Sequence, residues 1–171
     1  MQNMRRKGMR RMPEQILVIS DTHGSVAPVV GWLHEHPETD RIIHLGDYAE
    51  DAAEMEQLIG RPVISVRGNN DWTSMAPVEM VLHLSGHVLY LSHGHRLGVY
   101  YGTDQVARAA AKNGADVALY GHTHRYHEER QGGLLILNPG SASLPRDGMR
   151  SCALLFLSEG EAPAVKRIEL S

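Results

Sequence analysis

The feature that most constrains the fold is an apolar run that ends abruptly in two histidines. Val117-Ala118-Leu119-Tyr120 is followed directly by Gly121-His122-Thr123-His124. Such a run is typical of a buried strand, which would deliver the two imidazoles into a loop at its carboxyl end. Imidazoles one residue apart can bind a metal, although the same pattern also occurs on exposed strands with nothing bound. The pattern predicts a strand and leaves both interpretations of the histidines open.

Similar junctions recur earlier in the chain. Buried strands are predicted over residues 16–19, 41–45 and 63–66, and they end in Asp21-Thr22-His23-Gly24, Gly46-Asp47 and Gly68-Asn69-Asn70-Asp71. At the first junction, an Asp helix cap beside an exposed His would explain the residues equally well. Three units of strand, polar loop and helix-like segment in succession indicate parallel strands with right-handed crossovers. Such sheets bind ligands at the carboxyl ends of their strands.

The pattern changes after Trp72. Ser85-Gly86-His87 separates two short apolar segments and predicts a hairpin, whose second strand ends in Ser92-His93-Gly94-His95. Helices are predicted over residues 26–36, 50–59 and 103–113, and antiparallel strands over 126–130, 134–137, 151–157 and 164–168. These strands require two sheets, at least one of them mixed.

Composition bounds the size and class of the protein. A chain of 171 residues with 42% hydrophobic content is enough for one domain and too short for two, so we expect a single domain over residues 13–171. The net charge of −3 argues against a general nucleic-acid binder. No apolar run approaches the roughly 20 residues of a membrane span. The single Cys152 is expected in the core, which fits the reducing cytoplasm.

The first twelve residues are strongly basic and lack helical or strand periodicity. A nucleic-acid or membrane-surface arm would have this composition. A disordered leader over residues 1–12, or a true start at Met12, explains it more simply. No function is assigned to this segment.

The polar residues at the predicted strand ends form one candidate set of metal ligands. They offer oxygen and nitrogen donors and no thiolate, which suits two Mn, Fe, Zn or similar ions better than a structural zinc. Two carboxylates and four imidazoles leave such a pair of ions net positive and able to bind an anion. Asp47 is the natural bridging carboxylate. The set comprises Asp21, His23, Asp47, Asn69, His93, His122 and His124.

These motifs resemble, in order and spacing, the calcineurin-like metallophosphoesterase superfamily. The stretch from Asn138-Pro139-Gly140 to Arg146 is similar to the small YfcE-type phosphodiesterase branch. The resemblance extends from Ile16 to the C-terminus. It implies a four-layer α/β/β/α sandwich of two mixed sheets flanked by helices. It also implies a metal-bound hydroxide that attacks the phosphorus of a small phosphodiester or nucleotide-like substrate.

The resemblance further implies how the ions are held. Asp21, His23 and His124 would hold one ion, Asn69, His93 and His122 the other, and Asp47 would bridge them. Two divalent ions per chain are expected, Mn first, with Ni, Fe, Zn or Mg as alternatives. Because family members are often dimers or tetramers, a homodimer or homotetramer is expected.

One position departs from the family pattern. Many larger members carry His after the Asn ligand, where this chain has Asn70, and an amide cannot act as a general acid. His95 is the best substitute donor, with substrate contact or simple solvation as alternatives. Asn70, His95 and Arg146 are expected to contact substrate, although Arg146 could equally be a solvated or ion-paired turn residue. Without a strong acid, esters with low-pKa leaving groups should react fastest.

Two alternative functions come from other proteins of the same fold. The same fold resembles a retromer scaffold subunit, whose metal site has decayed and which acts by binding proteins. All seven ligand positions are filled here, which favours an enzyme. A nuclease similar to the larger DNA-repair relatives is not favoured, because no capping domain fits in this length, and no membrane or stable nucleic-acid partner is expected.

Overall fold

The computed structural model describes residues 11–171. The expected leader over residues 1–12 lies outside the described part of the chain, apart from Arg11 and Met12. Within residues 11–171, no helix combines the length and apolar character needed to cross a bilayer.

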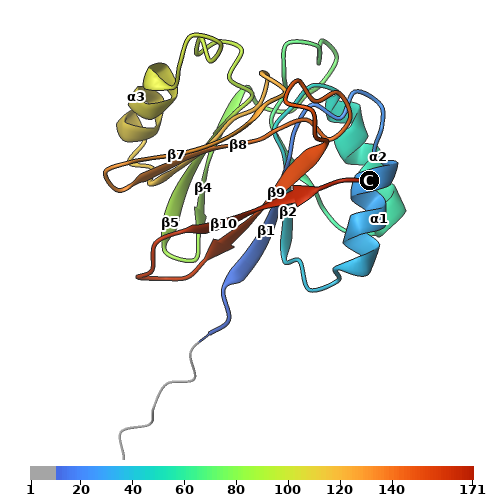
Figure 1. The fold of residues 1–171 in the computed structure, drawn as a ribbon, viewed down its shortest axis with the longest axis horizontal. Coiled ribbons are helices and arrows are strands. Elements are labelled where there is room, and N and C mark those ends of the chain that lie inside the picture. The colour runs from blue at the N-terminus through green and yellow to red at the C-terminus, as the bar shows by residue number, and fades with distance from the viewer. Residues whose placement is uncertain (1–10) are drawn as a thin grey trace, which may run out of the picture.

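Two five-stranded sheets lie face to face, with α1 and α2 covering one outer face and α3 the other (Figure 1). The fold is the expected four-layer α/β/β/α sandwich. The first sheet has the order β10-β9-β1-β2-β3 and the second the order β4-β5-β6-β8-β7. The helices are α1 (Ala27–Glu35), α2 (Ala49–Ile59) and α3 (Asp104–Lys112).

Both sheets are mixed. In the first sheet β1, β2 and β3 are parallel, β9 runs antiparallel to β1, and β10 runs antiparallel to β9. In the second sheet β5, β6 and β8 are parallel, and the edge strands β4 and β7 are antiparallel to their neighbours β5 and β8. The strands of the first sheet are β1 (Glu14–Ile19), β2 (Arg41–His44), β3 (Ile64–Ser65), β9 (Ser151–Leu157) and β10 (Ala164–Glu169). Those of the second are β4 (Glu79–Leu84), β5 (His87–Ser92), β6 (Val117–Leu119), β7 (Tyr126–Gln131) and β8 (Leu134–Pro139).

The apolar run of β1 is buried because the strand has a core on each side. Leu17 and Ile19 pack toward α1 and α2, whereas Ile16 and Val18 pack between the sheets. Side chains alternate across a strand, so a strand covered on both faces needs apolar residues at every position. The predicted burial of Cys152 is confirmed: its thiol is free and fully buried, and burial raises its pKa to about 12.

One expected element is absent from the described chain. The third polar loop is not followed by a helix, since the chain runs from Asp71 directly to β4. The seven residues between Asp71 and β4 are too few for a stable helix, and Pro77 opposes a continuous one. The prediction of three strand–loop–helix units was therefore wrong in its last member, although all three strands are parallel as expected.

Candidate metal centre

The polar loops that follow β1, β2, β3, β5 and β6 meet at one edge of the sandwich. Backbone hydrogen bonds tie them together: Asp21 N–H donates to the Gly46 carbonyl at 3.0 Å, and Gly121 N–H to the His93 carbonyl at 3.0 Å. The imidazole of His93 reaches across the two sheets to the carbonyl of Leu45. Four loops that are distant in sequence are thereby held at one place, and Asp71, which accepts the Asp47 N–H, joins the loop after β3 to them.

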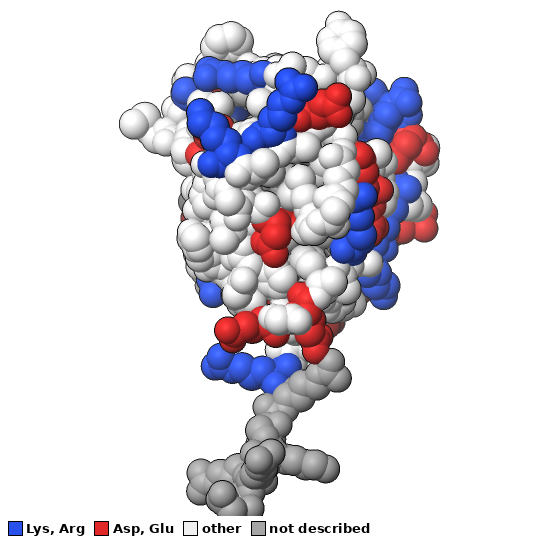
Figure 2. Space-filling model, turned by 90° about the vertical axis from the view of Figure 1, so that its left-hand side faces the viewer, with Lys and Arg blue, Asp and Glu red and all other residues white. Residues whose placement is uncertain are grey.

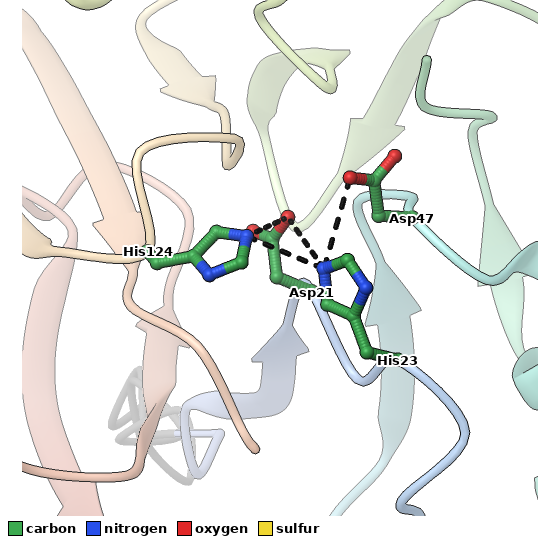
Figure 3. Close-up of side chains that lie close together, drawn as sticks. All are labelled: Asp21, His23, Asp47 and His124. Atoms are coloured by element: carbon green, nitrogen blue, oxygen red, sulfur yellow. Dashed lines mark hydrogen bonds and ion pairs between the residues drawn. The ribbon is translucent and has the colours of Figure 1, made fainter. Parts of the chain in front are cut away.

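The predicted ligands fall into two groups that share one carboxylate. The donor atoms of Asp21, His23, Asp47 and His124 lie within 4.8 Å of one another (Figure 3). Those of Asp47, His93 and His122 form a second such group. Asp47 directs Oδ2 toward His23 Nε2, at 3.8 Å, and Oδ1 toward His93 Nε2, at 3.4 Å. A carboxylate with one oxygen on each side is the arrangement that a bridging ligand requires.

Two buried oxygen atoms at this edge have no hydrogen-bond donor within the described structure. They are Oδ1 of Asp21 and Oδ1 of Asn69. Buried polar atoms are nearly always paired, and an orphaned carboxylate oxygen is especially costly. The other oxygen of Asp21 accepts from Ser20 Oγ and from His122 N–H, so only Oδ1 remains to face the cluster. A cation would satisfy both oxygens, and the residues therefore fit a metal.

Ring nitrogens of the imidazoles face the same space. His93 and His124 each place Nδ1 at 2.8 Å from a backbone carbonyl, of Leu45 and Leu144 respectively, so Nδ1 carries a proton and Nε2 is the nitrogen turned toward the cluster. Such hydrogen bonds fix the tautomer and orientation of metal-binding histidines. His23 Nε2 and His124 Nε2 are 3.3 Å apart, and His122 Nδ1 and His93 Nε2 3.2 Å. Two ring nitrogens at such a distance could both coordinate one cation.

The backbone is strained where these ligands lie. Of seven non-glycine residues with positive φ in the described chain, five are predicted ligands and a sixth, Tyr48, adjoins Asp47. Each such conformation costs on the order of 1 kcal/mol, and such strain clusters at functional sites. Asp and His tolerate the left-handed region better than most residues. The five ligands are Asp21, His23, Asp47, His122 and His124.

Two glycines allow the loops to approach one another closely. A Cβ on Gly68 would lie 2.1 Å from Oδ1 of Asp47, and one on Gly121 would lie 2.0 Å from Oγ of Ser20. A methyl group on Gly68 would displace the carboxylate of Asp47. A methyl group on Gly121 would displace the Ser20 hydroxyl, which donates to Asp21. The glycines of the Gly-Asn and Gly-His motifs therefore serve close packing around the ligands.

Asp47 and His122 are held in the charge states that bind metals. Burial opposes ionisation of Asp47, but its hydrogen bond to His93, the charge of His93 and the hydrogen bonds from Asn70 outweigh burial and hold its pKa well below the usual range. Burial, followed by the positive charge of His93, lowers the pKa of His122 to about 4. Asp47 is therefore ionised and His122 neutral near neutral pH, which are the forms that bind metals.

Residues outside the ligand set hold these loops in place. Asn138 donates from Nδ2 to the Gly121 carbonyl and to Thr123 Oγ1, and Ser141 and Ser143 donate hydroxyl hydrogen bonds to the Asp21 carbonyl. Residues 138–143 are all buried and thus support the ligand loops from within. His44, fully buried, pairs with Thr22 Oγ1 and with Gly46 N–H.

The three predicted substrate-contacting residues all lie beside the cluster. Asn70 donates from Nδ2 to Asp47 Oδ2 at 2.8 Å. The His95 ring is 5.5 Å from that of His93, and its Nδ1 is buried without a partner among the described residues. Arg146 donates to the Tyr100 hydroxyl at 2.9 Å, and Tyr100 in turn donates to the His122 carbonyl. Sequence reasoning did not assign this last role to Tyr100, since nothing in a lone Tyr signals it.

The sandwich and its Asp/His cluster define the class of protein as a metallophosphoesterase. The chain belongs to the calcineurin-like phosphoesterase superfamily, because residues 15–160 match the family model described as a calcineurin-like phosphoesterase superfamily domain. It is 31% identical over 152 residues to a probable metallophosphoesterase, YsnB, of Bacillus subtilis, and the match covers 88% of each chain. Phosphodiesterase YfcE of Escherichia coli is 36% identical over 105 residues, which cover 56% of this chain and 53% of that protein.

Solved structures share the fold at low identity. A predicted phosphoesterase of Streptococcus pneumoniae superposes with a TM-score of 0.74 at 24% identity and covers 93% of this chain and 99% of that one. The zinc complex of Vps29 from Entamoeba histolytica superposes with a TM-score of 0.75 at 20% identity, over 92% of this chain and 99% of that one. These likenesses confirm the expected fold.

Proposed function

We propose that this protein is a phosphodiesterase that works with two divalent metal ions bound per chain. The observation that carries the proposal is the pair of donor groups that share Asp47, together with the buried, unpartnered oxygens of Asp21 and Asn69. In the assignment we propose, Asp21, His23 and His124 hold one ion and Asn69, His93 and His122 the other. Asp47 bridges the two.

The ions, when bound, would lower the pKa of a coordinated water and neutralise the phosphate. The chain itself supplies position and orientation. Through their Nδ1 protons, His93 and His124 keep Nε2 aimed at the centre. The amide of Asn70, already in contact with Asp47, is placed to donate a hydrogen bond to a phosphate oxygen. Arg146, held by Tyr100 at the edge of the site, is placed to pair with phosphate charge.

His95 is the proposed donor to the leaving group. Its ring lies 5.5 Å from that of His93 and 6.2 Å from that of His122, on the side of the centre formed by the second ligand group. Burial, and then the positive charge of His93, lowers its pKa, so it presents a neutral N–H near neutral pH. A neutral imidazole stabilises a leaving oxygen by a hydrogen bond more readily than by full protonation. Good leaving groups should therefore be favoured.

The names of the relatives support the substrate class. YfcE is called a phosphodiesterase and YsnB a probable metallophosphoesterase. For this chain we propose a small phosphodiester or nucleotide-like substrate, manganese as the preferred ion, a cytoplasmic location and a homodimer or homotetramer. Light scattering on the eluting protein would give the oligomeric state directly.

A protein-binding scaffold is the second candidate. The fold is shared with Vps29, and large apolar side chains are exposed on loops at the same edge as the cluster: Trp72 is 87% exposed, Met75 98% and Tyr101 97%. Exposed apolar side chains in a group can mark a binding surface. A scaffold would not need every ligand position, and the filled set of seven favours the enzyme.

Calorimetric titration of chelator-stripped protein with Mn²⁺ tests the metal assignment independently of turnover. We expect two ions per chain in the wild type and a loss of stoichiometry or affinity in Asn69→Ala, which removes the second orphaned oxygen. Binding of two ions with equal affinity in both proteins would contradict the assignment of Asn69.

A further inference from the structure

A cavity of about 320 Å³ opens beside the second ligand group and is lined by Asn69, Arg67, Arg96, His95 and Trp72. We propose that this cavity binds a second anionic group of the substrate, such as the other phosphate of a nucleoside bisphosphate ester. The inference rests on the proposed function, because Asn69 lines the cavity and is also a proposed ligand of the second metal ion. An ester arm that leaves the centre on this side would enter the cavity directly.

The cavity wall carries positive charge that nothing in the described chain neutralises. Neither Arg67 nor Arg96 makes a side-chain hydrogen bond or ion pair to another residue in the range 11–171. Both arginines line the same cavity as His95. Two unpaired guanidinium groups on one cavity are suited to a phosphate, which they bind with directed hydrogen bonds.

The single carboxylate of the wall is already occupied. Oδ2 of Asp71 accepts hydrogen bonds from the backbone N–H groups of Asp47 and Gly68, and Oδ1 from that of Ala49. Both carboxylate oxygens of Asp71 therefore bind backbone N–H groups of the loops, and neither pairs with Arg67 or Arg96. Figure 2 shows several Lys and Arg side chains at the upper end of the molecule, with an acidic group among them and further basic side chains on the right-hand side.

The shape and rim of the cavity fit an organic arm that carries the charge. A volume of about 320 Å³ is at the small end of ligand pockets and holds a nucleoside-sized group at most. Trp72, 87% exposed, offers an indole face at the rim on which a base or sugar can pack. The class that these features select is a phosphodiester whose arm bears a further phosphate.

A matched pair of chromogenic esters tests the proposal on the manganese-loaded protein. Thymidine 5′-(4-nitrophenyl phosphate) and the same ester with a 3′-phosphate share a leaving group and differ only in the second anion. We expect the 3′-phosphorylated ester to have a kcat/KM about tenfold higher in the wild type, chiefly through a lower KM. Arg67→Gln and Arg96→Gln should each reduce this preference, and the double variant should abolish it. Arg108→Gln, which removes an exposed charge on α3, should retain it.

Binding of the products separates this proposal from the proposed hydrolysis. By calorimetry, thymidine 3′,5′-bisphosphate should bind the wild type about tenfold more tightly than thymidine 5′-monophosphate, and the double variant should bind both alike. Equal binding in the wild type, or a preference that survives in the double variant, would overturn the cavity assignment. If the binding preference holds and depends on both arginines while neither ester is hydrolysed, the cavity assignment stands and the proposed phosphodiesterase activity is overturned.

Discussion

The carboxylate of Asp71 holds the backbone of Asp47: its Oδ2 accepts the Asp47 N–H at 3.0 Å. The same oxygen accepts the Gly68 N–H at 2.6 Å, and Oδ1 accepts the Ala49 N–H at 2.7 Å. One buried side chain thus joins the loop that carries Asp47 to the loop that carries Asn69. Asp71 acts on the centre through these loops, without a donor atom of its own directed at it.

Asp71→Asn should therefore weaken metal binding while the fold is retained. An Asn side chain has one oxygen in place of two and turns an N–H₂ group toward backbone donors, so at least one amide loses its acceptor. Loss of such supporting hydrogen bonds typically lowers metal affinity about 10- to 100-fold. Calorimetric titration with Mn²⁺, with circular dichroism as the check on folding, measures the effect. If the folded variant bound Mn²⁺ with wild-type affinity, Asp71 would have no role in positioning the metal ligands.

Gly68→Ala should disrupt the centre by steric displacement. The added methyl would lie 2.1 Å from Oδ1 of Asp47, so the carboxylate must move. We expect the second metal ion to be lost and activity to fall by at least about 100-fold. Gly31→Ala is the matched control, because its Cβ meets nothing within 4 Å in the middle of α1. That control should bind metal normally and be more stable by about 0.5–1 kcal/mol.

Much of this centre could be predicted from the sequence because each ligand follows a buried strand. The apolar runs before Asp21, Asp47 and His122 place them at strand ends, and parallel strands bring such ends together. The same reasoning counted a third strand–loop–helix unit, whereas the short segment after Asp71 contains Pro77 and runs into β4 without a helix.

Contacts that depend on long-range packing could not be predicted. Tyr100 lies on the loop before α3, and only the folded structure shows its hydroxyl at the His122 carbonyl. The free guanidinium groups of Arg67 and Arg96 are likewise invisible in sequence, where any Arg could be solvated or paired. Pairing between residues far apart in the chain is decided by the register of both sheets, which no local pattern specifies.

The His87–Asp116 pair should make stability depend on pH. His87 is buried, with Nδ1 at 2.6 Å from Asp116 Oδ2 and Nε2 at 3.0 Å from the Ser158 carbonyl. Burial opposes protonation, but the hydrogen bonds to Asp116 and Ser158 outweigh it and raise the pKa of His87 above the usual value. The stabilisation is therefore fully present below the unfolded pKa, about 6.5, and is lost as pH rises through the folded pKa.

Asp116→Asn tests this linkage, since it removes the charge while keeping an oxygen for the Val88 N–H. Relative to wild type, the variant should lose up to about 1 kcal/mol of unfolding free energy at pH 5.5, and less at pH 8.5. Urea unfolding of metal-free protein at both pH values measures the difference. A loss that is the same at both pH values would show that His87 is not the titrating group.

The leaving group should limit turnover. Asn70 cannot donate a proton as a strong acid, and His95 has a pKa lowered by burial. We expect kcat for an aryl phosphodiester to exceed that for a matched alkyl phosphodiester by at least about 100-fold, the usual contribution of a general acid. Equal kcat values for the two esters would mean that an efficient proton donor is present.

The most direct test of the two-metal assignment is hydrolysis of an aryl phosphodiester by chelator-stripped protein after ions are added back. Mn²⁺, Ni²⁺, Mg²⁺ and Zn²⁺ should be compared, with Asp47→Asn measured in parallel. The account predicts that activity returns with metal in the wild type and falls by at least about 100-fold in the variant, because the shared carboxylate no longer bridges the ions. A wild type that binds two ions and hydrolyses no phosphodiester would contradict the phosphodiesterase assignment and favour a scaffold.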